Sequence, residues 1–294
     1  MSFFLAHLSD SHVPPLPVAR LRDLAGKRLL GYLNWTRNRV AIHRRDVLDA
    51  LVADMQAQRP DHIAVTGDIV NLALYSEFAP ALRWLRSVGP PDDVTLIPGN
   101  HDAYVRGALK QFCTTFDPYL RGDNGQAGFP FLRRRGPVAL IAVSSAVPTP
   151  PLMATGWLGD TQLQALDAML AGLADAPLFR VLLIHHPLRS TQNMKRLVDA
   201  PAVLDILKRR GVDLVLHGHD HVHATIHVDG PRAPIPVVCV PSASSIAHRH
   251  YPAAAYHLFA IDGDTNAWRC VQTVRGFGDG DGESIRELKS VRVV

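Results

Sequence analysis

The chain has 294 residues, of which 47% are hydrophobic and 20% charged, a composition that excludes a disordered or low-complexity chain and predicts a sizeable buried core. The formal net charge of +4 is too small to indicate a nucleic-acid-binding protein unless it is clustered on one face. Fifteen histidines accompany only three cysteines. This ratio points away from a disulfide scaffold and towards metal sites built from nitrogen and oxygen ligands.

The cysteines and the N-terminus bear on where the protein works. Cys113, Cys239 and Cys270 are far apart and form no C-x-x-C pair, which excludes a cysteine zinc cage and predicts reduced, packed thiols. Residues 1–6 are too short for the apolar core of a signal peptide. The longest uncharged stretch, residues 136–159, contains four prolines, which are atypical of a membrane span. We therefore expect a cytoplasmic protein.

Five short apolar runs predict strands. They cover residues 3–8, 62–66, 94–97, 180–184 and 213–216. Near-continuous apolar runs of this length are typical of strands covered on both faces. Apolar residues at helical spacing predict three helices between them, over residues 43–58, 161–173 and 201–210. We expect Asp160 to cap the second of these helices and Gly211 to end the third.

After residue 221 the pattern changes. Four strand-like runs follow one another without a helical pattern between them, at residues 223–228, 236–240, 256–261 and 267–274. These runs predict a second, more antiparallel sheet. The glycine-rich residues 276–282 predict a flexible turn. The alternation of strand, polar loop and helix before residue 221 is typical of a layered α/β protein.

A polar motif follows each of the first five runs. In chain order the motifs are Asp10-x-His12, Gly67-Asp68, Gly99-Asn100-His101-Asp102, His185-x-Pro187 and Gly218-His219-x-His221. Each is weak alone, because a single histidine is more often a satisfied core or surface residue than a ligand. Loops at the carboxyl ends of strands converge on one edge of a sheet, so we expect the five motifs to meet in space.

The residue types in these motifs suit a transition-metal site. Asp10 and His12 lie two apart on an extended segment and can reach one ion from the same face, and His219 and His221 repeat this spacing. Carboxylate oxygens and imidazole nitrogens without a thiolate suit Mn²⁺, Fe or Zn²⁺. Asp68 follows a strand at a tight turn, where its two oxygens can contact two ions at once.

The ordered set of motifs resembles the calcineurin-like metallophosphoesterase family over residues 4–260, and within it the bacterial class III cyclic-nucleotide phosphodiesterase branch. The resemblance implies an α/β fold, a four-layer α-β-β-α sandwich in which helices flank two mixed β-sheets. It implies a catalytic domain over residues 1–275, with a basic amphipathic cap inserted at about 13–45. The glycine-rich turn and the short segment after it, residues 276–294, are expected to form a C-terminal appendage. The resemblance also implies two divalent transition-metal ions as cofactors, Mn²⁺ and/or Fe, with Zn²⁺ accepted by the same ligands.

Carried over residue by residue, the resemblance implies two metal sites that share one carboxylate. The first site would comprise Asp10, His12, Asp68 and His221, and the second Asp68, Asn100, His185 and His219. Two ions roughly 3.5–4 Å apart can share a hydroxide that attacks phosphorus in line with the leaving group. His101 would donate a proton to the departing oxygen, and Asp102 would orient the His101 imidazole through a hydrogen bond.

The other histidines are expected to be structural. They are His186 and His217, beside ligand candidates, and, within predicted strands or helices, His7, His43, His62, His223, His227 and His257. For the loop His248-Arg249-His250-Tyr251, a surface position and a place at the substrate edge are both open. The sequence departs from the family pattern at Asn71, where many relatives have a second acid.

The insertion at residues 13–45 is rich in basic residues. Its single acid, Asp23, is accompanied by Arg20, Arg22, Lys27, Arg28, Arg37, Arg39, Arg44 and Arg45. One hypothesis is a solvated amphipathic cap over the sheet. The other is a basic lid that binds an anionic, partly apolar substrate or rests on an anionic membrane surface, at the inner membrane face.

These features together predict a dinuclear-metal-dependent phosphoester hydrolase, by default a phosphodiesterase acting on a small phosphoester such as a cyclic nucleotide. The alternative is a membrane-peripheral pyrophosphatase of the UDP-diacylglucosamine type in lipid A metabolism, which rests on the basic insertion alone. Nucleic acid is not an expected partner. A protein-binding scaffold that kept the fold is the non-enzyme alternative. It is disfavoured because every metal position and His101 are filled.

Overall fold

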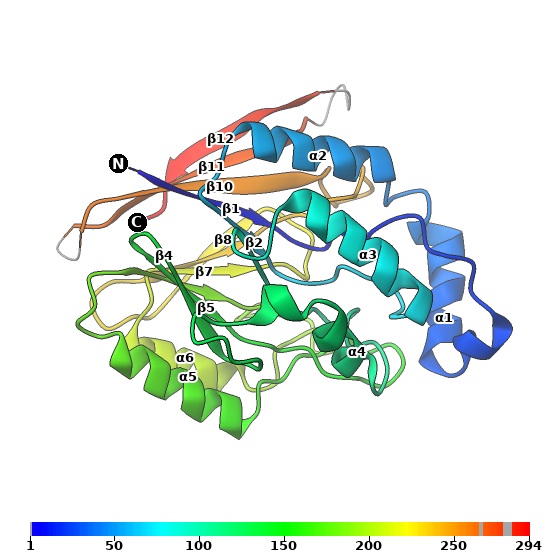
Figure 1. Ribbon diagram of the computed structural model, residues 1–294, viewed down its shortest axis with the longest axis horizontal. Coiled ribbons are helices and arrows are strands. Elements are labelled where there is room, and N and C mark those ends of the chain that lie inside the picture. Colours follow the sequence, from blue (N-terminus) through cyan, green and yellow to red (C-terminus); the bar gives the residue numbers. More distant parts are fainter. Residues whose placement is uncertain (1, 265–266, 279–283) are drawn as a thin grey trace.

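The computed structural model describes residues 2–264, 267–278 and 284–294. Two six-stranded sheets pack face to face around a shared core (Figure 1). The first sheet has the order β12 (Ile285–Arg292), β11 (Arg269–Phe277), β10 (Ala255–Asp262), β1 (Phe3–Leu8), β2 (His62–Val65) and β3 (Val94–Leu96). The second has the order β4 (Phe131–Arg135), β5 (Val138–Ala142), β6 (Phe179–Leu183), β7 (Leu214–His217), β9 (Ile235–Cys239) and β8 (Ala224–Val228).

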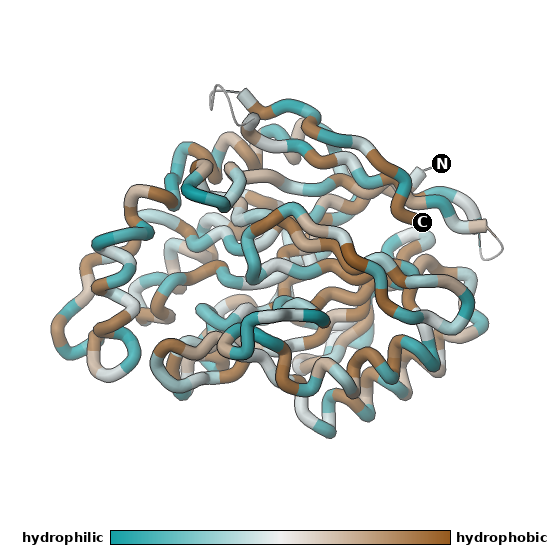
Figure 2. The backbone as a smooth tube through the Cα atoms, turned by 180° about the vertical axis from the view of Figure 1, so that it is seen from behind, coloured by the Kyte–Doolittle hydropathy of each residue, from teal (hydrophilic) through white to brown (hydrophobic). Residues whose placement is uncertain are grey.

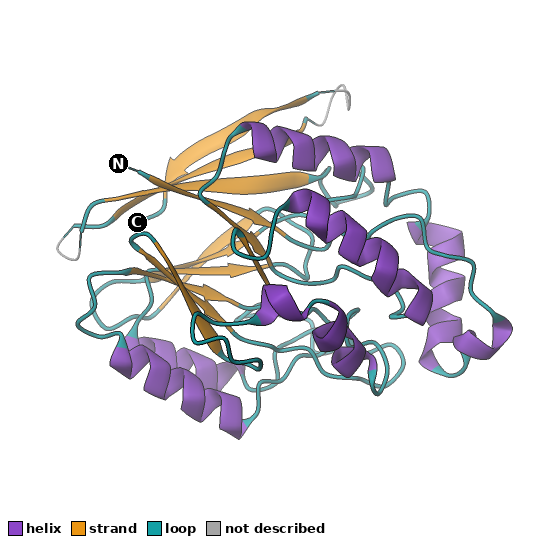
Figure 3. Ribbon diagram, viewed as in Figure 1, coloured by secondary structure: helices purple, strands orange, loops and turns teal. Residues whose placement is uncertain are grey.

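Helices cover the outer face of each sheet (Figure 3). Those against the first sheet are α2 (Arg45–Ala57) and α3 (Tyr75–Val88), and those against the second are α5 (Asp160–Gly172) and α6 (Ala200–Arg210). In the sequence, α4 (Ala108–Thr115) and the short 3₁₀ helix η3 (Asp117–Leu120) lie between β3 of the first sheet and β4 of the second. The layers therefore run helix, sheet, sheet, helix, which confirms the predicted four-layer sandwich.

Both sheets are mixed, as predicted. The strands β1, β2 and β3 are parallel to one another, whereas β10, β11 and β12 are antiparallel to their neighbours. In the second sheet β5, β6, β7 and β9 are parallel, and β4 and β8 are antiparallel edge strands. The strand-like runs after residue 221 are thus divided between the sheets, and do not form a separate antiparallel one.

The central strands are buried on both faces, which explains their near-continuous apolar sequences. In β5, Val138 and Leu140 belong to the core between the sheets, whereas Ala139 and Ile141 belong to the core under α5 and α6. Successive side chains of a strand alternate between its faces, so a strand covered on both sides is apolar throughout. Figure 2 shows the outer helices, in contrast, as alternating apolar and polar residues.

The predicted helices are present, with one correction at a helix start. Asp160 is the first residue of α5 and Gly159 occupies the capping position, without a side-chain hydrogen bond. The predicted cap at Asp160 is therefore wrong, although its carboxylate in the first turn still suits the helix dipole. Gly211 ends α6 with a φ of 73°, a left-handed conformation that glycine adopts without steric cost.

The C-terminal residues join the first sheet. The strand β12 pairs with β11 along its length, and the boundary expected at residue 275 falls inside β11. Of the predicted turn at 276–282, residues 276 and 277 belong to β11, and residues 279–282 lie outside the described residues. In the described ranges, the structure contains no helix of the length and apolarity that crossing a membrane requires.

The insertion forms a cap at one end of the sandwich (Figure 1). It contains the 3₁₀ helix η1 (Leu21–Leu24), the helix α1 (Lys27–Asn34) and one turn of π-helix, η2 (Trp35–Arg39). Lys27 Nζ donates a hydrogen bond of 2.7 Å to Thr149 Oγ1, and Arg28 Nε donates one of 3.0 Å to the carbonyl oxygen of Leu72. Two of the basic side chains therefore attach the cap to loops of the sandwich.

Candidate metal centre

The five polar motifs meet at the carboxyl ends of strands from both sheets. The first three follow β1, β2 and β3 of the first sheet, and the other two follow β6 and β7 of the second. Backbone contacts join them: Asp10 N–H donates to Gly67 O at 3.0 Å, and His219 N–H donates to the Asp10 carboxylate at 3.0 Å. The predicted convergence is confirmed, but it is built from two sheet edges instead of one.

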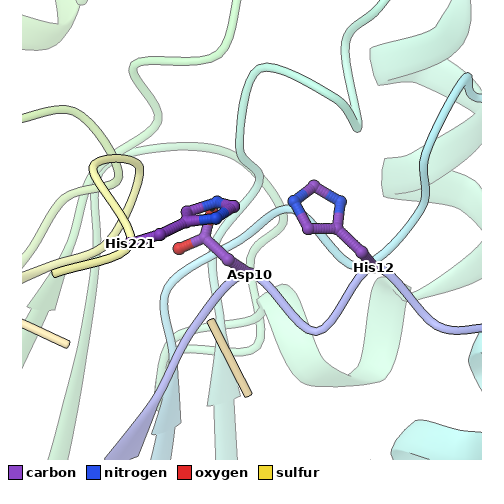
Figure 4. A group of neighbouring side chains, drawn as sticks. All are labelled: Asp10, His12 and His221. Atoms are coloured by element: carbon purple, nitrogen blue, oxygen red, sulfur yellow. The ribbon is translucent and has the colours of Figure 1, made fainter. Parts of the chain in front are cut away.

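One group of donor atoms surrounds Asp10. His221 Nε2 lies 3.0 Å from Asp10 Oδ1, and ligand atoms of Asp10, His12 and His221 all lie within 4.8 Å of one another. Figure 4 shows that Asp10 and His12 project from one segment while His221 reaches them from a separate loop. His12 Nε2 lies 4.0 Å from Asp68 Oδ2, which connects this group to the next.

A second group surrounds Asn100. Its Oδ1 atom lies 2.8 Å from His219 Nδ1 and 3.2 Å from His185 Nε2. His185 Nε2 also lies 3.5 Å from Asp68 Oδ2. Asp68 therefore stands between the two groups, in the position expected of a shared ligand. All seven residues proposed as ligands from the sequence lie in these two groups.

The backbone at this centre is held in an uncommon conformation. Five of the seven ligand candidates have positive φ values of 38–70°: Asp10, His12, Asp68, His219 and His221. Residues other than glycine rarely adopt this region, and each such residue costs roughly 1–3 kcal/mol that the surrounding structure must offset. The sharp turns aim side chains from separate loops at one point.

Two motif glycines allow these loops to approach each other. A Cβ atom on Gly99 would collide with the Asp68 carboxylate and the His185 ring, and one on Gly218 would collide with the side chains of Ser9 and Asp10. Gly218 therefore permits a close approach between the loop of His219 and the loop of Asp10. Both positions lack room for any side chain.

The protonation states of the donors fit metal ions. Burial holds the pKa of His12 and His219 well below the usual range, so both imidazoles are neutral and carry a free lone pair. Burial by itself would raise the pKa of Asp10 and Asp68, but the neighbouring imidazoles of His221 and His185 lower it, so both carboxylates are ionised. His185 differs: burial alone would lower its pKa, but the Asp68 carboxylate raises it to about 10, so its proton must leave when a metal ion binds. Neutral imidazoles beside charged carboxylates are the ligands that divalent transition metals take.

An unpartnered atom supports the same conclusion. His12 Nε2 is buried and forms no hydrogen bond with any residue that the structure describes, although a buried polar atom normally has a partner. Its separation of 4.0 Å from Asp68 Oδ2 is too long for a hydrogen bond. The separation still suits two ligands of a common ion, which lie at most about 4.2 Å apart when each bond is about 2.1 Å.

The predicted hydrogen bond between Asp102 and His101 is wrong. The Asp102 carboxylate instead accepts hydrogen bonds of 2.8–3.1 Å from four backbone N–H groups, those of Asp68, Ile69, Val70 and Gly99. His101 Nδ1 donates to the carbonyl oxygen of Asn71. Asp102 therefore fixes the backbone of the two loops that carry Asp68 and Asn100, and Asn71 orients His101 through its main chain.

The cap supplies residues to this centre that the sequence patterns did not reveal. His43, expected inside a helix, lies before α2 with its ring 4.8 Å from that of His12, and its Nδ1 lies 2.8 Å from Ser244 Oγ. Arg39 Nη1 lies 3.2 Å from His101 Nε2. The spacing of four between Trp35, Arg39 and His43 was the available signal, because residues four apart share one face of a helix.

A cavity of about 530 Å³ opens above the centre. The residues that line it include Asp68, Asn100, His101 and His219. The cap contributes Asn34, Asn38, Arg39, Ile42 and His43, and the loop whose position the sequence left open contributes His248, Arg249 and Tyr251. That loop therefore borders the cavity, whereas His250 is not among the residues that line it.

Four other histidines are buried in the fold and held by a hydrogen bond through at least one ring nitrogen, which fits the structural role expected of them. His7 Nε2 and His62 Nε2 lie 2.9 and 2.7 Å from threonine hydroxyls. His186 Nδ1 lies 2.7 Å from Ser145 Oγ, and His217 Nδ1 lies 3.0 Å from Gly218 O. Burial lowers the pKa of each of these four imidazoles, so they are neutral core residues.

Comparisons with known proteins agree with this geometry. In solved structures, a dimetal phosphatase from Danio rerio is similar with a TM-score of 0.66, 15% identity and 98% of each chain covered. The purple acid phosphatase PPD1 from yellow lupin (Lupinus luteus) has a TM-score of 0.60, 12% identity, and coverage of 99% of this chain and 53% of that one. At such low sequence identities, these similarities show a shared fold and nothing more.

The sequence comparisons go further. Glycerophosphodiester phosphodiesterase GpdQ from Enterobacter lignolyticus (strain SCF1) is 28% identical over 186 residues, which are 62% of this chain and 56% of that protein. The match thus spans little more than half of the relative's length. A model of the calcineurin-like phosphoesterase family matches residues 5–223. The chain therefore belongs to the calcineurin-like phosphoesterase family, a family of metal-dependent phosphoester hydrolases.

Proposed function

We propose that this protein is a phosphodiesterase that hydrolyses a small phosphodiester with two divalent transition-metal ions. One ion would be held by Asp10, His12, Asp68 and His221, and the other by Asp68, Asn100, His185 and His219. One observation carries the proposal: the two groups of donor atoms meet at Asp68, whose Oδ2 lies within 4.0 Å of ring nitrogens from both groups.

Mn²⁺ and/or Fe are the ions we propose, and Zn²⁺ is compatible with the same donors. A bound pair of such ions supplies Lewis acidity at a phosphate group and activates a water molecule as the nucleophile. With the ions bound in place of ligand protons, the chain would contribute two ionised carboxylates, Asp10 and Asp68, and otherwise neutral donors. This leaves the loaded centre with a net positive charge that favours an anionic substrate.

His101 is the residue we propose to interact with the departing oxygen, because it lines the cavity beside Asn100. Its ring is held through Nδ1 by the carbonyl oxygen of Asn71, and without substrate its Nε2 atom accepts a hydrogen bond from Arg39 Nη1 at 3.2 Å. In this proposal Nε2 gains a proton and exchanges Arg39 for the departing oxygen when the phosphoester binds. We propose Asp102 as a positioning residue. Its four backbone hydrogen bonds hold the loops of Asp68 and Asn100 in register without contact to substrate.

A cyclic nucleotide or a glycerophosphodiester is the substrate class we propose. A relative of 28% identity is named a glycerophosphodiester phosphodiesterase, which supports a diester. The cavity of about 530 Å³ falls within the size range of small-molecule sites. Arg39, Lys195 and Arg249 line it, and their positive charge favours an anionic phosphate.

A second candidate is the membrane-peripheral pyrophosphatase of the UDP-diacylglucosamine type. The observation in its favour is the tip of the cap, residues 18–22. There Val18 and Leu21 are 93% and 91% exposed and alternate with Arg20 and Arg22. Exposed apolar and basic side chains together suit an anionic membrane surface at the inner membrane face. In the leading proposal the protein is cytoplasmic.

The rest of the basic insertion gives this second candidate less support. Arg44 is paired with Asp46 in the first turn of α2, and Arg45 Nε lies 2.8 Å from Asp49. Arg39 faces the metal centre. The charge available to a membrane is therefore divided between the tip of the cap, where Arg22 Nε lies 4.0 Å from Asp23, and the exposed Arg37. The run from Arg37 to Arg45 is not one continuous basic surface.

A substrate panel with added Mn²⁺ tests the proposal. The panel contains bis(p-nitrophenyl) phosphate, 3′,5′-cyclic AMP, a glycerophosphodiester, p-nitrophenyl phosphate and UDP-diacylglucosamine. We expect diesters to be hydrolysed with a higher kcat/KM than the monoester, and hydrolysis of the monoester alone would contradict a phosphodiesterase. The double variant Arg20→Glu with Arg22→Glu reverses the charge at the tip of the cap and distinguishes the two candidate functions. The second candidate predicts that this variant loses activity on UDP-diacylglucosamine only.

A further inference from the structure

The guanidinium group of Arg39 lies between two histidines at the edge of the metal centre. Its Nη1 atom is 3.2 Å from His101 Nε2. Its Nε and Nη2 atoms are 3.4 and 3.3 Å from His43 Nε2. Arg39 also lines the cavity that contains Asp68 and Asn100. The cap thus delivers one cation directly beside the place where a substrate phosphate would bind.

The charge of Arg39 has no carboxylate partner within 4.0 Å among the residues that the structure describes. Other arginines of the chain differ in this respect: Arg45 pairs with Asp49, and Arg275 pairs with Asp54 at 2.8 Å. An arginine remains protonated in proteins, and a partly buried charge is costly unless it is paired. Arg39 therefore has an unmet requirement for an anion.

The two histidines hold Arg39 without neutralising it. A guanidinium only donates hydrogen bonds, so Nε2 of His43 and of His101 must both be acceptors. Their Nδ1–H groups then donate to Ser244 Oγ at 2.8 Å and to the carbonyl oxygen of Asn71. Neutral imidazoles on both sides fix the orientation of the guanidinium and leave its charge intact.

Trp35 supports the same arrangement from the cap. Its ring is stacked on the His43 ring with centroids 5.8 Å apart and an interplanar angle of 10°, and it is 4% exposed. The Arg39 guanidinium lies 5.9 Å from the Trp35 ring. The cation is therefore pre-positioned by packing, which lowers the entropic cost of binding a ligand.

We propose that Arg39 is a substrate-binding residue that donates hydrogen bonds to a non-bridging oxygen of the substrate phosphate. Three of the five N–H donors of its guanidinium face the imidazoles, and the other two remain for an anion. A guanidinium fork matches the geometry of phosphate oxygens. The inference rests on the proposed function, because it takes the phosphoester to bind over the metal centre.

The role assigned to Arg39 makes the cap part of the substrate site. Arg37 lies in the same turn, η2, but is exposed and is not among the residues that line the cavity. The two arginines therefore form a matched pair for an experiment. One faces the phosphate position and the other faces solvent, while both carry the same charge on the same local structure.

The test compares Arg39→Met, Arg39→Lys and Arg37→Met with the wild type, each loaded with Mn²⁺ and checked for metal content. The dissociation constant of inorganic phosphate is measured by titration calorimetry, and KM and kcat are measured with bis(p-nitrophenyl) phosphate. For Arg39→Met we expect phosphate affinity to fall and KM to rise by about 10- to 100-fold, as for loss of a hydrogen bond to a charged group. Arg37→Met should change neither value by more than about two-fold.

Arg39→Lys guards against a purely structural effect. It keeps the charge and loses the fork, so we expect a phosphate affinity between those of wild type and Arg39→Met. Unchanged phosphate affinity and KM in Arg39→Met with full metal content would overturn the inference and leave the proposed function standing. Equal losses in Arg39→Lys and Arg39→Met accompanied by metal loss would also overturn it, since they indicate a structural role.

The calorimetric readout keeps the inference separate from the proposed function. If the wild type binds phosphate but hydrolyses no diester, the proposed phosphodiesterase activity fails. The dependence of phosphate binding on Arg39 then still decides the inference. Phosphate binding that falls in Arg39→Met but not in Arg37→Met would support it in that case as well.

Discussion

The Nδ1 atom of His219 lies 2.8 Å from the Oδ1 atom of Asn100, although 119 residues separate the two in the chain. Asn100 follows β3 of the first sheet and His219 follows β7 of the second. The candidate metal centre therefore lies where the two halves of the sandwich meet. Ions bound there would connect the halves directly.

This position predicts that metal ions stabilise the whole fold. A ligand that binds only the folded chain adds about 2.7 kcal/mol per site when its free concentration is 100 times its dissociation constant. We expect urea unfolding to shift to a lower midpoint after chelation and to recover with Mn²⁺. Equal midpoints with and without metal, at unchanged slope, would argue against a centre shared by both sheets.

His101→Ala tests the residue placed beside the departing oxygen. Removing a group that transfers or donates a proton typically costs about 10²–10⁴-fold in rate, and His101 is not in either proposed set of metal ligands. We therefore expect kcat for bis(p-nitrophenyl) phosphate to fall by this factor while elemental analysis finds the metal content unchanged. Loss of both ions in this variant would mean that His101 is a ligand instead.

Asp102→Ala, unlike His101→Ala, should lower the stability and the metal content of the protein. The substitution leaves four backbone N–H groups without their acceptor, and each unsatisfied buried group costs about 1–3 kcal/mol before relaxation and water entry. We expect a loss of about 3 kcal/mol in the free energy of unfolding together with reduced metal content. Asp102→Asn retains one acceptor oxygen and is the graded control, which should fall between the wild type and Asp102→Ala.

Gly218→Ala tests the close approach of two loops. The added Cβ would collide with Ser9 and Asp10, so we expect displacement of the His219 loop and loss of metal binding. Gly172→Ala at the end of α5 is the matched control, since nothing lies within 4 Å of the new Cβ. It should be neutral or stabilising by up to about 1 kcal/mol. Full metal content in Gly218→Ala would contradict so close an approach of the two loops.

The ion pair between Asp54 and Arg275 gives a pH-dependent prediction. Asp54 Oδ1 accepts hydrogen bonds from Arg275 Nε at 2.8 Å and from the Tyr256 hydroxyl at 2.6 Å. Burial alone would raise the pKa of Asp54, but these donors hold it below its usual value. The pKa of this carboxyl group is therefore lower in the folded protein than in the unfolded chain, where it is about 3.9. Its contribution to stability is fully present above the pKa of the unfolded chain, and it is lost as the pH falls through the pKa of the folded protein.

Asp54→Asn should therefore destabilise the protein by about 1–3 kcal/mol at pH 7, and the difference from wild type should shrink below about pH 4. Urea unfolding of both proteins at pH 7 and at pH 3 measures this difference. Asp49→Asn, which removes the exposed partner of Arg45, is the control and should have an effect of less than about 1 kcal/mol. A difference that stays constant with pH would contradict the assignment.

The ligand candidates could be predicted because each lies within four residues of the end of a strand and because the ordered motifs resemble those of a known family. An apolar run that ends in Asp10 or Asp68 indicates both the strand and the edge at which its polar residues emerge. The division of the later strands between two sheets could not be predicted in this way. The pairing of β10 with β1, for example, joins residues 257 and 7, and local periodicity carries no information about such a partner.

The contacts that the cap and Asp102 make could not be predicted from sequence patterns either. Arg39 and His43 reach the centre only because the cap packs back onto the sandwich. An aspartate beside a histidine suggests a side-chain pair, as for Asp102 and His101. The left-handed turn at Asp68, with a φ of 53°, instead points successive backbone N–H groups at the Asp102 carboxylate, and such a nest binds an anion strongly.

The most direct test of the metal-dependent phosphodiesterase is Asn100→Ala, measured for metal content and for hydrolysis of bis(p-nitrophenyl) phosphate beside the wild type. Asn100 has no other part in the proposed mechanism, so its loss isolates the second ion. We predict about two metal ions per wild-type chain, about one per variant chain, and a loss of activity of at least about 100-fold. Full hydrolysis by the variant, or a wild type that hydrolyses the diester without bound metal, would contradict the account.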